Sequence, residues 1–260
     1  MLVLYYIQIM QDTIDAILFD MGGTLRRNRK RDPVEKAAIV QQIMDLLGLQ
    51  MPAPEFTKIL ESRAKSYESW ATGKLIELNE IDLWTKWMLP DLRADNVGPL
   101  AMQLNEIWRE AIASRVLFPE TKATILKLHE RGYQLAVVSN TTSSVDSPRA
   151  LEEADLAAYF DAIILSCVLG KRKPGADILL HAAGCLNVDP SRCVYVGDRP
   201  EWDVVSARKA GFRYAIIVEN PFRPLSASLP QEQIPDYSIK NLLELLDIFP
   251  QRNPLQGISV

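Results

Sequence analysis

Short apolar runs that alternate with helical segments constrain the fold of this chain more than any other feature of its 260 residues. The run IDAILF at residues 14–19 is almost unbroken by polar side chains, as in a buried parallel strand. Similar runs occupy residues 134–138, 162–165, 193–196 and 213–218. Helical segments lie between them at residues 120–131, 176–183 and 204–210, and each is followed by a glycine that can end a helix. This alternation predicts an α/β fold with a parallel sheet.

Polar side chains follow four of these strands at their carboxyl ends, where ligands bind in sheets of this type. The strand ends carry an aspartate with a glycine turn, a hydroxyl with an amide, a basic residue before a proline, and an acidic pair: Asp20 with Gly22 and Gly23, Ser139 with Asn140, Lys173 before Pro174, and Asp198 with Asp203. Pro174 suits the first position of the following helix. Carboxylates beside a lysine and a hydroxyl predict a magnesium site next to a cradle for an anion.

Residues 32–115 break the alternation, because apolar side chains there follow only helical spacing and prolines divide the segment into about four helices. We therefore predict an all-helical domain of about 84 residues inserted into an α/β core of residues 14–25 and 118–249. Residues 220–235 are expected to form an extended surface passage, and residues 239–249 a final amphipathic helix. Residues 1–13 are expected to be an N-terminal extension, either an edge strand or a segment before a start at Met10, and residues 250–260 a C-terminal tail.

The charge of the chain is −4, which is too close to neutral to favour nucleic acid or an anionic membrane as a partner. Five positive charges lie within residues 26–31, so the remainder carries −9. This basic run is interpreted either as a solvated cluster on a connector or as a clamp for an anionic substrate.

Three cysteines without metal-site spacing fit a reducing cytoplasm, and residues 1–11 are too short to span a bilayer.

Four sequence motifs occur in one order along the chain, namely FDMGGTL, VVSN, GKRKP and VYVGDRPEWD. With the helical insertion after the first motif, the chain resembles the haloacid dehalogenase-like hydrolase superfamily, subfamily I with a C1 cap, from about Ile14 to Phe249. The resemblance implies a Rossmann-like core, a helical cap that closes over the substrate, and hydrolysis of a small phosphorylated metabolite with Mg²⁺ as the cofactor. It leaves the oligomeric state open.

The resemblance also implies a role for each motif residue. Asp20 would be the nucleophile that forms an aspartyl-phosphate, while Ser139 and Lys173 would contact the phosphoryl group. Mg²⁺ would be held by Asp20, the backbone carbonyl of Gly22 and Asp198, with Asp203 acting from behind them by orienting water or Lys173. Gly23 and Asn140 would complete the substrate contacts together with Gly22.

Gly22 departs from the pattern of most phosphatases in this family, which carry a second aspartate there. A glycine can offer its carbonyl to a metal but has no carboxyl group to protonate the leaving group or activate water. Loss of a general acid–base typically costs about 10²–10⁴ in rate. Because a weakly basic leaving group needs less help, we expect labile phosphates, such as anomeric, acyl or aryl esters, as substrates.

Three other interpretations stay open. A dehalogenase is disfavoured because Asp198 and Asp203 retain the metal site. A phosphonatase-like enzyme that cleaves a C–P bond would need a cap lysine as a Schiff base, and the candidates are Lys36, Lys58, Lys65 and Lys74. A catalytically weakened protein that binds a phosphorylated ligand or a protein partner would explain Gly22, but not the retained nucleophile.

Tryptophans are concentrated in the helical insertion, which contains Trp70, Trp84, Trp87 and Trp108. They are expected to form its core rather than a substrate pocket. Trp202 stands between the two motif carboxylates Asp198 and Asp203, where it is expected to shape the entrance of the site.

Overall fold

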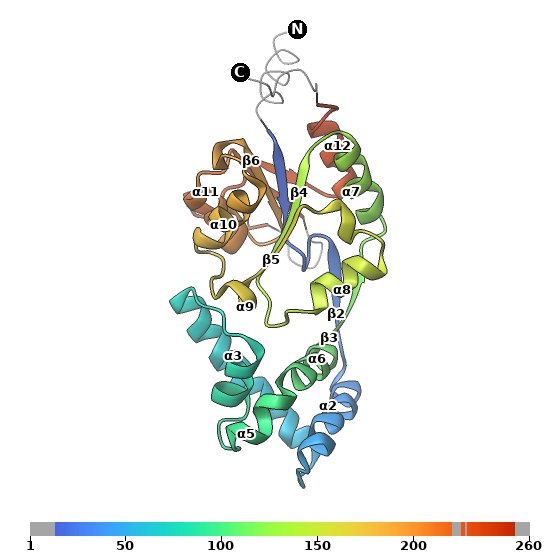
Figure 1. Ribbon diagram of the computed structural model, residues 1–260, viewed down its shortest axis with the longest axis vertical. Helices are drawn as coiled ribbons and strands as arrows, with labels where there is room; N and C mark the ends of the chain where they lie inside the picture. The colour runs from blue at the N-terminus through green and yellow to red at the C-terminus, as the bar shows by residue number, and fades with distance from the viewer. Residues whose placement is uncertain (1–13, 220–224, 227, 253–260) are drawn as a thin grey trace.

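A six-stranded parallel sheet forms the centre of the molecule in the computed structural model, which describes residues 14–219, 225–226 and 228–252 (Figure 1). The strand order is β5-β4-β1-β6-β7-β8. The bounds are β1 Ala16–Phe19, β4 Gln134–Ser139, β5 Ala162–Leu165, β6 Cys193–Gly197, β7 Tyr214–Val218 and β8 Tyr237–Ile239. The chain builds β4 and β5 on one side of β1 and the later strands on the other, so the strand order reverses at β1. The parallel α/β core predicted from the alternation is confirmed, and β8 is an additional strand.

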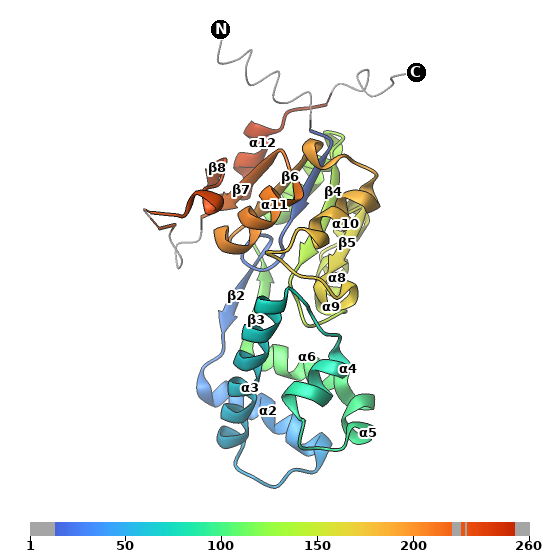
Figure 2. The same ribbon diagram turned by 90° about the vertical axis from the view of Figure 1, so that its left-hand side faces the viewer.

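Side chains of the sheet alternate between two buried faces, as the strand period of two requires. Ile17 and Phe19 of β1 pack toward α7 Thr121–Glu130, α8 Asp146–Glu153 and α12 Leu245–Ile248. Ala16 and Leu18 pack toward α10 Asp177–Leu186 and α11 Val205–Ala210. Figure 2 shows these two helices lying over the sheet. All four residues of β1 are fully buried. A strand with two covered faces reads as a continuous apolar run, which is why this strand was recognisable in the sequence.

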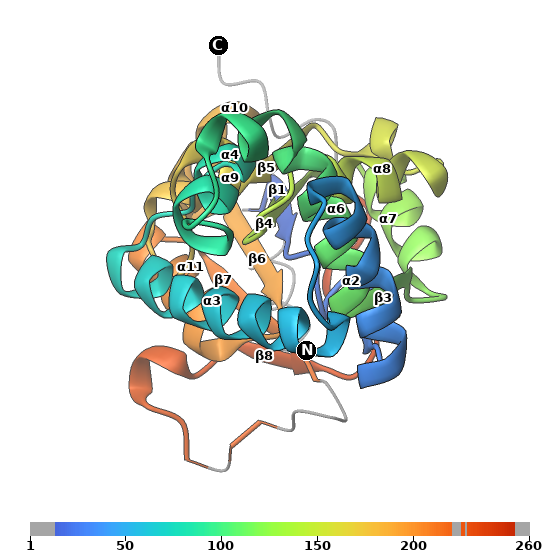
Figure 3. The same cartoon turned by 90° about the horizontal axis from the view of Figure 1, so that it is seen from below.

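A helical region is inserted between β1 and β4, beyond the carboxyl ends of the strands (Figure 3). It comprises α2 Pro33–Leu47, α3 Ala53–Lys74, α4 Glu80–Leu83, the π-helical turn Trp84–Met88, α5 Ala94–Val97, the 3₁₀ turn Gly98–Leu100 and α6 Ala101–Ile112. Its apolar side chains form a core separate from the two sheet faces. Trp84 and Trp108 are buried in that core, and the rings of Trp70 and Trp87 contact each other in a tilted arrangement with centroids 5.2 Å apart.

An antiparallel ribbon joins the helical region to the sheet domain. β2 Arg26–Lys30 pairs with β3 Ala113–Leu117, so most of the predicted basic connector is a β-strand. The sequence did not reveal this strand because residues 27–30 are all exposed and polar, without the alternation that marks a half-buried strand. The two crossings between cap and core are therefore held side by side by backbone hydrogen bonds.

Three other local predictions need correction. The segment predicted as a helix over residues 239–249 begins in β8 and becomes helical only from the 3₁₀ turn Leu242–Glu244 into α12, because Asn241 and Glu244 form a capping box there. α10 continues through Gly184 to Leu186, since Asn187 adopts the left-handed conformation that ends it. Pro174 lies in a turn three residues before α10 begins, and the Lys173–Pro174 peptide is cis.

The remaining short elements are the 3₁₀ turns Ala157–Tyr159, Pro190–Arg192 and Gln231–Gln233, the helix α9 Ser166–Leu169, and the π-helical turn Pro200–Val204. The predictions for residues 1–13, for residues 253–260 of the tail, and for residues 220–224 and 227 of the surface passage lie outside the described residues. Among the residues that the structure describes, no helix is both long and apolar enough to cross a membrane.

Candidate active site

The register of the sheet brings the predicted strand-end residues to one edge. Phe19 of β1 lies opposite Val137 of β4 and Val196 of β6. Asp20 follows Phe19 directly, and Ser139 and Asp198 lie two residues beyond Val137 and Val196. Asp20, Ser139 and Asp198 therefore end three adjacent strands, at the point where the strand order reverses.

A tight turn follows Asp20 and faces Asp198. The carbonyl of Met21 accepts backbone hydrogen bonds from Leu25 at 3.1 Å and from Arg26 at 3.0 Å. Gly23 has a φ of +98°, and a Cβ built there would lie 2.1 Å from Oδ2 of Asp198. Only glycine fits this position, because a side chain would both strain the backbone and collide with the neighbouring carboxylate.

Lys173 lies at the centre of the site and is 1% exposed. Its Nζ donates to Oδ1 of Asp20 at 2.7 Å and to Oδ1 of Asp203 at 2.7 Å. Burial by itself would lower the pKa of Lys173, but the two carboxylates outweigh burial and raise it well above its ordinary value. Lys173 is therefore held as an ammonium ion in direct contact with the predicted nucleophile.

Both oxygens of Asp203 are already used within the protein. Oδ1 accepts from Lys173, while Oδ2 accepts from the backbone N–H groups of Asp198 at 3.0 Å and Arg199 at 2.9 Å. Gly197 allows this approach, since a Cβ there would lie 2.3 Å from Cγ of Asp203. Asp203 therefore contacts the ammonium of Lys173 and the backbone of residues 198–199 at the same time.

Asp198 is the carboxylate whose environment fits a cation. Its Oδ1 is buried without a hydrogen-bond partner. Burial, and then the charges of Asp20 and Asp203, raise the pKa of Asp198 to about 8. Burial likewise raises the pKa of Asp20. Positive charge beside these carboxylates would favour their ionised form.

Asp20, Asp198 and the carbonyl of Gly22, in the turn after Asp20, can supply oxygen ligands, and Mg²⁺ commonly binds through one or two carboxylates while it keeps several waters. The described residues contain no group of three or more His, Cys, Asp or Glu side chains placed to hold a metal by themselves. The residues present therefore fit a magnesium ion that depends on backbone oxygen and water for the rest of its ligands.

Asn140 contacts the chain around Lys173 rather than open space. Its Oδ1 accepts from the backbone N–H of Lys173 and its Nδ2 donates to the carbonyl of Lys173, both at 2.9 Å. The resemblance places Asn140 among the substrate contacts, and in the structure both polar atoms of its amide group bond the backbone of Lys173. Ser139, at the end of β4, is buried.

Tyr195 belongs to the site and was missed in the sequence, where it reads as part of the apolar run of β6. Its hydroxyl accepts from Nζ of Lys173 at 2.6 Å and donates to the carbonyl of Val138 at 2.9 Å. The one signal was a hydroxyl within an otherwise apolar strand just before Asp198.

The helical region reaches the site through a buried carboxylate that was also missed. Glu77, in the loop between α3 and α4, accepts from Oγ of Ser166 at 3.1 Å and lies 3.3 Å from Nη1 of Arg172. Tyr67 of α3 donates to the same carboxylate. Trp202 of the core packs against this corner, with the guanidinium of Arg172 5.6 Å from its ring centroid. The cap is thus joined to the residue directly before Lys173.

Comparison with known proteins agrees with this geometry. The haloacid dehalogenase-like hydrolase family matches residues 14–211. A glyceraldehyde 3-phosphate phosphatase of Methanopyrus kandleri is 25% identical over 236 residues, covering 90% of this chain and 97% of that protein. A phosphoserine phosphatase of Thermus thermophilus is 32% identical over 255 residues, covering 88% of this chain and 96% of that protein. The crystal structure of a HAD phosphatase from Thermococcus onnurineus shares the fold, with a TM-score of 0.61 and 24% identity over 92% of this chain and 99% of that one.

Proposed function

This chain belongs to the haloacid dehalogenase-like hydrolases, and from that premise we propose that it is a magnesium-dependent phosphohydrolase that acts on a small phosphorylated metabolite through Asp20. The observation that carries the proposal is the buried ion-pair centre at the strand ends, in which Lys173 contacts Asp20 and Asp203 at 2.7 Å. The two curated relatives described above are phosphatases, which supports a phosphate ester as the substrate class.

Hydrolysis would proceed in two displacements. An oxygen of Asp20 attacks the phosphorus atom, the P–O bond to the leaving group breaks, and the leaving oxygen departs with the bonding electron pair and takes a proton from solvent. Water then attacks the phosphorus of the aspartyl-phosphate and gives a proton to solvent, the P–O bond to Asp20 breaks and regenerates the carboxylate, and inorganic phosphate leaves. The ammonium of Lys173 offsets the negative charge that develops on the phosphoryl oxygens, and the hydroxyl of Ser139 is proposed to donate to one of them.

Asp20, Asp198 and the carbonyl of Gly22 would hold the magnesium ion, which when bound supplies positive charge that lets an anionic carboxylate meet an anionic phosphate. Asp203, Asn140 and Tyr195 would act on Lys173. Asp203 neutralises and aims its ammonium group, Asn140 holds its backbone, and Tyr195 accepts its third proton.

Because Gly22 has no side chain, it cannot protonate the leaving group as the aspartate at this position does in most phosphatases of the family. We propose for this reason that the substrate carries a weakly basic leaving group. A Cβ built on Gly22 would meet only Nδ2 of Asn28, at 3.5 Å, which is ordinary van der Waals contact. The absence of a side chain there is therefore not demanded by packing. Gly22→Asp tests the idea directly: it should accelerate cleavage of simple alkyl phosphates more than that of p-nitrophenyl phosphate. Equal rates on both classes in the parent chain, with no gain from Gly22→Asp, would overturn it.

A screen of phosphate release over phosphorylated metabolites with Mg²⁺ tests the proposed activity, with Asp20→Asn as the matched control because it keeps the shape and removes the charge. The chain should release phosphate and the variant should not. Activity that survives Asp20→Asn would contradict the mechanism. Phosphorylated compounds that bind without being cleaved would instead favour the second candidate suggested by Gly22, a catalytically weakened binding protein.

The phosphonatase interpretation is not supported by the cap lysines. Lys58, Lys65 and Lys74 are exposed, and Lys36 forms an ion pair with Glu61 at 2.5 Å. A Schiff-base lysine has to be desolvated to lose its proton near neutral pH. The dehalogenase interpretation is likewise unsupported, since the carboxylates Asp198 and Asp203 are both built into the site.

A further inference from the structure

The loop between α3 and α4 contacts the core on both sides of Lys173. Glu77 of this loop lies 3.3 Å from Nη1 of Arg172, the residue directly before Lys173. A Cβ built on Gly175, two residues after Lys173, would lie 3.6 Å from Cδ1 of Leu75. Leu75 ends α3 with a φ of +56°, a backbone conformation that residues other than glycine rarely adopt. The loop that begins at this turn therefore lies against the segment that carries Lys173.

Glu77 also reaches the chain that follows β4, and it does so through Ser166. Oγ of Ser166 accepts from the backbone N–H of Thr141 at 2.8 Å, and it lies 3.1 Å from both Oε2 of Glu77 and the carbonyl oxygen of Thr141. A hydroxyl group has one proton to donate, so these two acceptors share it. Thr141 directly follows Asn140, whose amide group bonds the backbone of Lys173. Both chain segments that hold Lys173 are thus connected to Glu77.

The two carboxylate oxygens of Glu77 are divided between cap and core. Oε1 accepts from the hydroxyl of Tyr67 in α3, whereas Oε2 faces Ser166 and Arg172. The hydroxyl of Tyr67 also accepts from the backbone N–H of Leu78 at 2.8 Å, which ties the loop to α3. Burial raises the pKa of Glu77, while its three side-chain partners act to lower it. The carboxylate is therefore held by the cap through one oxygen and bound to the core through the other.

Arg172 depends on the cap for its counter-charge. Its side chain is 5% exposed, and its Nε is buried without a hydrogen-bond partner. Among the residues that the structure describes, its ion pairs are with two carboxylates of the helical region, Glu77 at 3.3 Å and Glu68 of α3 at 3.9 Å. The side chain of Glu68 is 60% exposed, so water screens its charge, whereas Glu77 is buried. Because a buried cation without a buried partner costs free energy, loss of the Glu77 contact would disturb the chain next to Lys173.

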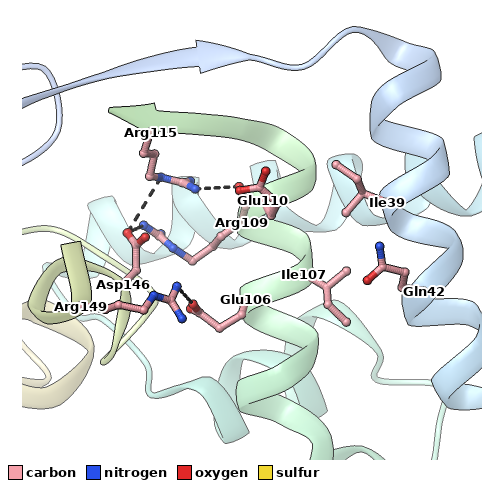
Figure 4. A pocket seen from close by; sticks show the side chains of 9 residues that line it. All are labelled: Ile39, Gln42, Glu106, Ile107, Arg109, Glu110, Arg115, Asp146 and Arg149. Atoms are coloured by element: carbon pink, nitrogen blue, oxygen red, sulfur yellow. Dashed lines mark hydrogen bonds and ion pairs between the residues drawn. The ribbon is translucent and has the colours of Figure 1, made fainter. Parts of the chain in front are cut away.

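A second junction holds the cap to the core at a different place. Asp146, the first residue of α8, accepts from Nη2 of Arg26 at 2.5 Å and from Nη2 of Arg109 at 2.6 Å, and Nε of Arg115 lies 3.9 Å away. These arginines come from β2, α6 and β3. Figure 4 shows Arg109 and Arg115 beside Asp146 at a cavity of about 420 Å³. The cap keeps this attachment when Glu77 is changed.

We propose that Glu77 is a positioning residue for the hydrolysis. By binding Ser166 and Arg172 together, it fixes the two chain segments that hold Lys173, so that the ammonium group stays in place beside Asp20. One cap side chain thereby couples the position of the cap loop to the catalytic centre. The effect on rate rests on the proposed function, whereas the effect on the backbone around Lys173 does not.

Hydrogen exchange of the full chain, followed by mass spectrometry, measures the effect on the backbone without a substrate. Glu77→Gln removes the charge and leaves one acceptor oxygen in place of two. Glu68→Gln is the matched control, because it removes the same charge beside the same guanidinium from an exposed position. Peptides that contain Thr141 and Lys173 should exchange about tenfold faster or more in Glu77→Gln, and at the parent rate in Glu68→Gln. Equal exchange in Glu77→Gln and the parent chain would overturn the proposal.

Steady-state hydrolysis of p-nitrophenyl phosphate with Mg²⁺ measures the effect on the reaction. Glu77→Gln should lower kcat about tenfold or more and change KM by less than about threefold, because the ammonium of Lys173 acts on charge that develops in the transition state. Glu77→Asp, which keeps the charge, should recover part of the lost kcat, and Glu68→Gln should retain the parent value. If Glu77→Gln does not fold, Glu77→Asp should still show a lower kcat and faster exchange than the parent chain.

Asp146→Asn distinguishes positioning of Lys173 from attachment of the cap in general. It weakens the second junction, so it should lower the Tm while kcat and the exchange around Lys173 stay at the parent values. A loss of kcat in Asp146→Asn as large as that in Glu77→Gln would contradict the proposal, and so would an unchanged kcat in Glu77→Gln. If the parent chain hydrolyses no phosphate ester, the proposed function fails, and the exchange result alone decides whether Glu77 fixes the chain around Lys173.

Discussion

Lys173 connects most of the chemistry of the site through a single ammonium group. It is fully buried, and its charge is balanced by Asp20 and Asp203, each 2.7 Å from Nζ. Removal of one partner from a buried ion pair is costly because the remaining charge cannot be solvated. The same contacts that prepare the site for an anion therefore also stabilise the fold.

Lys173→Met should lower the free energy of unfolding by about 3–5 kcal/mol, because it leaves two carboxylates buried without a cation. Lys171→Met is the matched control. The side chain of Lys171 is half-exposed and forms a solvent-exposed ion pair with Asp177 at 3.4 Å, so its loss should cost no more than about 1 kcal/mol. Urea unfolding followed by circular dichroism measures both. Equal stability of the two variants would show that the buried ion pairs do not stabilise the protein.

Tyr195→Phe should lower kcat and cost about 1–3 kcal/mol of stability, because one proton of Lys173 and the carbonyl of Val138 lose their partner. Tyr214→Phe is the control, since the buried hydroxyl of Tyr214 has no hydrogen-bond partner and its removal should be neutral or stabilising. Steady-state kinetics and thermal unfolding of both variants check this expectation. An unchanged kcat in Tyr195→Phe would remove Tyr195 from the positioning of Lys173.

Gly22 and Gly23 are neighbours with opposite tolerance for a side chain. Gly22→Ala should fold with stability within about 1 kcal/mol of the parent chain, because its Cβ meets only Asn28 at 3.5 Å. Gly23→Ala should be strongly destabilised, because it combines a φ of +98° with a Cβ 2.1 Å from Asp198. Thermal unfolding distinguishes them, and a stable Gly23→Ala would contradict the geometry of the turn.

The polar residues at the strand ends could be predicted from the sequence, but their hydrogen-bond partners could not. Asp20, Lys173, Asp198 and Asp203 were predictable because each directly follows an apolar run or lies in a motif, and parallel strands bring such positions to one edge. The contacts of Asn140 and Tyr195 with Lys173 depend on how two loops and one strand face pack against one another. A local sequence pattern does not encode that packing.

The elements of the core were predicted better than the connections between core and cap. Strands with two covered faces are apolar throughout, whereas β2 presents Arg27, Asn28, Arg29 and Lys30 to solvent and shows neither an apolar run nor alternation. Its strand character comes from pairing with β3, more than eighty residues later in the chain. The ribbon was therefore predicted as a connector, although it aligns both crossings into the cap.

Asp146 joins these elements, and its effect on stability should depend on pH. Burial would raise its pKa, but Arg109 and Arg26 outweigh burial and hold the pKa well below the ordinary value of 3.8. A carboxyl group with a lowered pKa in the folded state stabilises the protein above its unfolded pKa, and that contribution is lost as the pH falls through the folded value.

The difference in unfolding free energy between the parent chain and Asp146→Asn should therefore be constant from pH 7 to about pH 5 and shrink below about pH 4. Urea unfolding of both proteins at several pH values measures this difference. A difference that grows as the pH falls would mean that Asp146 is protonated more readily in the folded protein than in the unfolded chain, contrary to its three arginine contacts.

At the scale of the whole molecule, the cap is attached to the core by polar contacts on both sides of the strand-end site. Glu77 binds Ser166 and Arg172 on one side, and Arg109 binds Asp146 on the other. Between them, Glu80 accepts from the backbone N–H of Ser144 at 2.6 Å and Asn105 donates to the carbonyl of Thr142 at 2.8 Å. The sequence predicted a helical insertion, but not these contacts, which involve single polar residues of the cap helices and of the loop between α3 and α4.

The basic run of residues 26–31, which offsets part of the acidic charge of this chain with its net charge of −4, lies in two different environments. The basic run is divided by the ribbon: Arg26 is buried against Asp146, and Arg27, Arg29 and Lys30 are exposed. Part of a sequence feature that suggested substrate capture is thus a structural junction between cap and core.

In the proposed mechanism, Asp20 carries the phosphoryl group during hydrolysis. Acid quenching of the enzyme during turnover of p-nitrophenyl phosphate with Mg²⁺, followed by mass spectrometry of its peptides, detects such an intermediate. We expect a mass increase of one phosphoryl group on the peptide that contains Asp20, and no such species in Asp20→Asn. Active enzyme whose phosphoryl group is found on a different residue would contradict it.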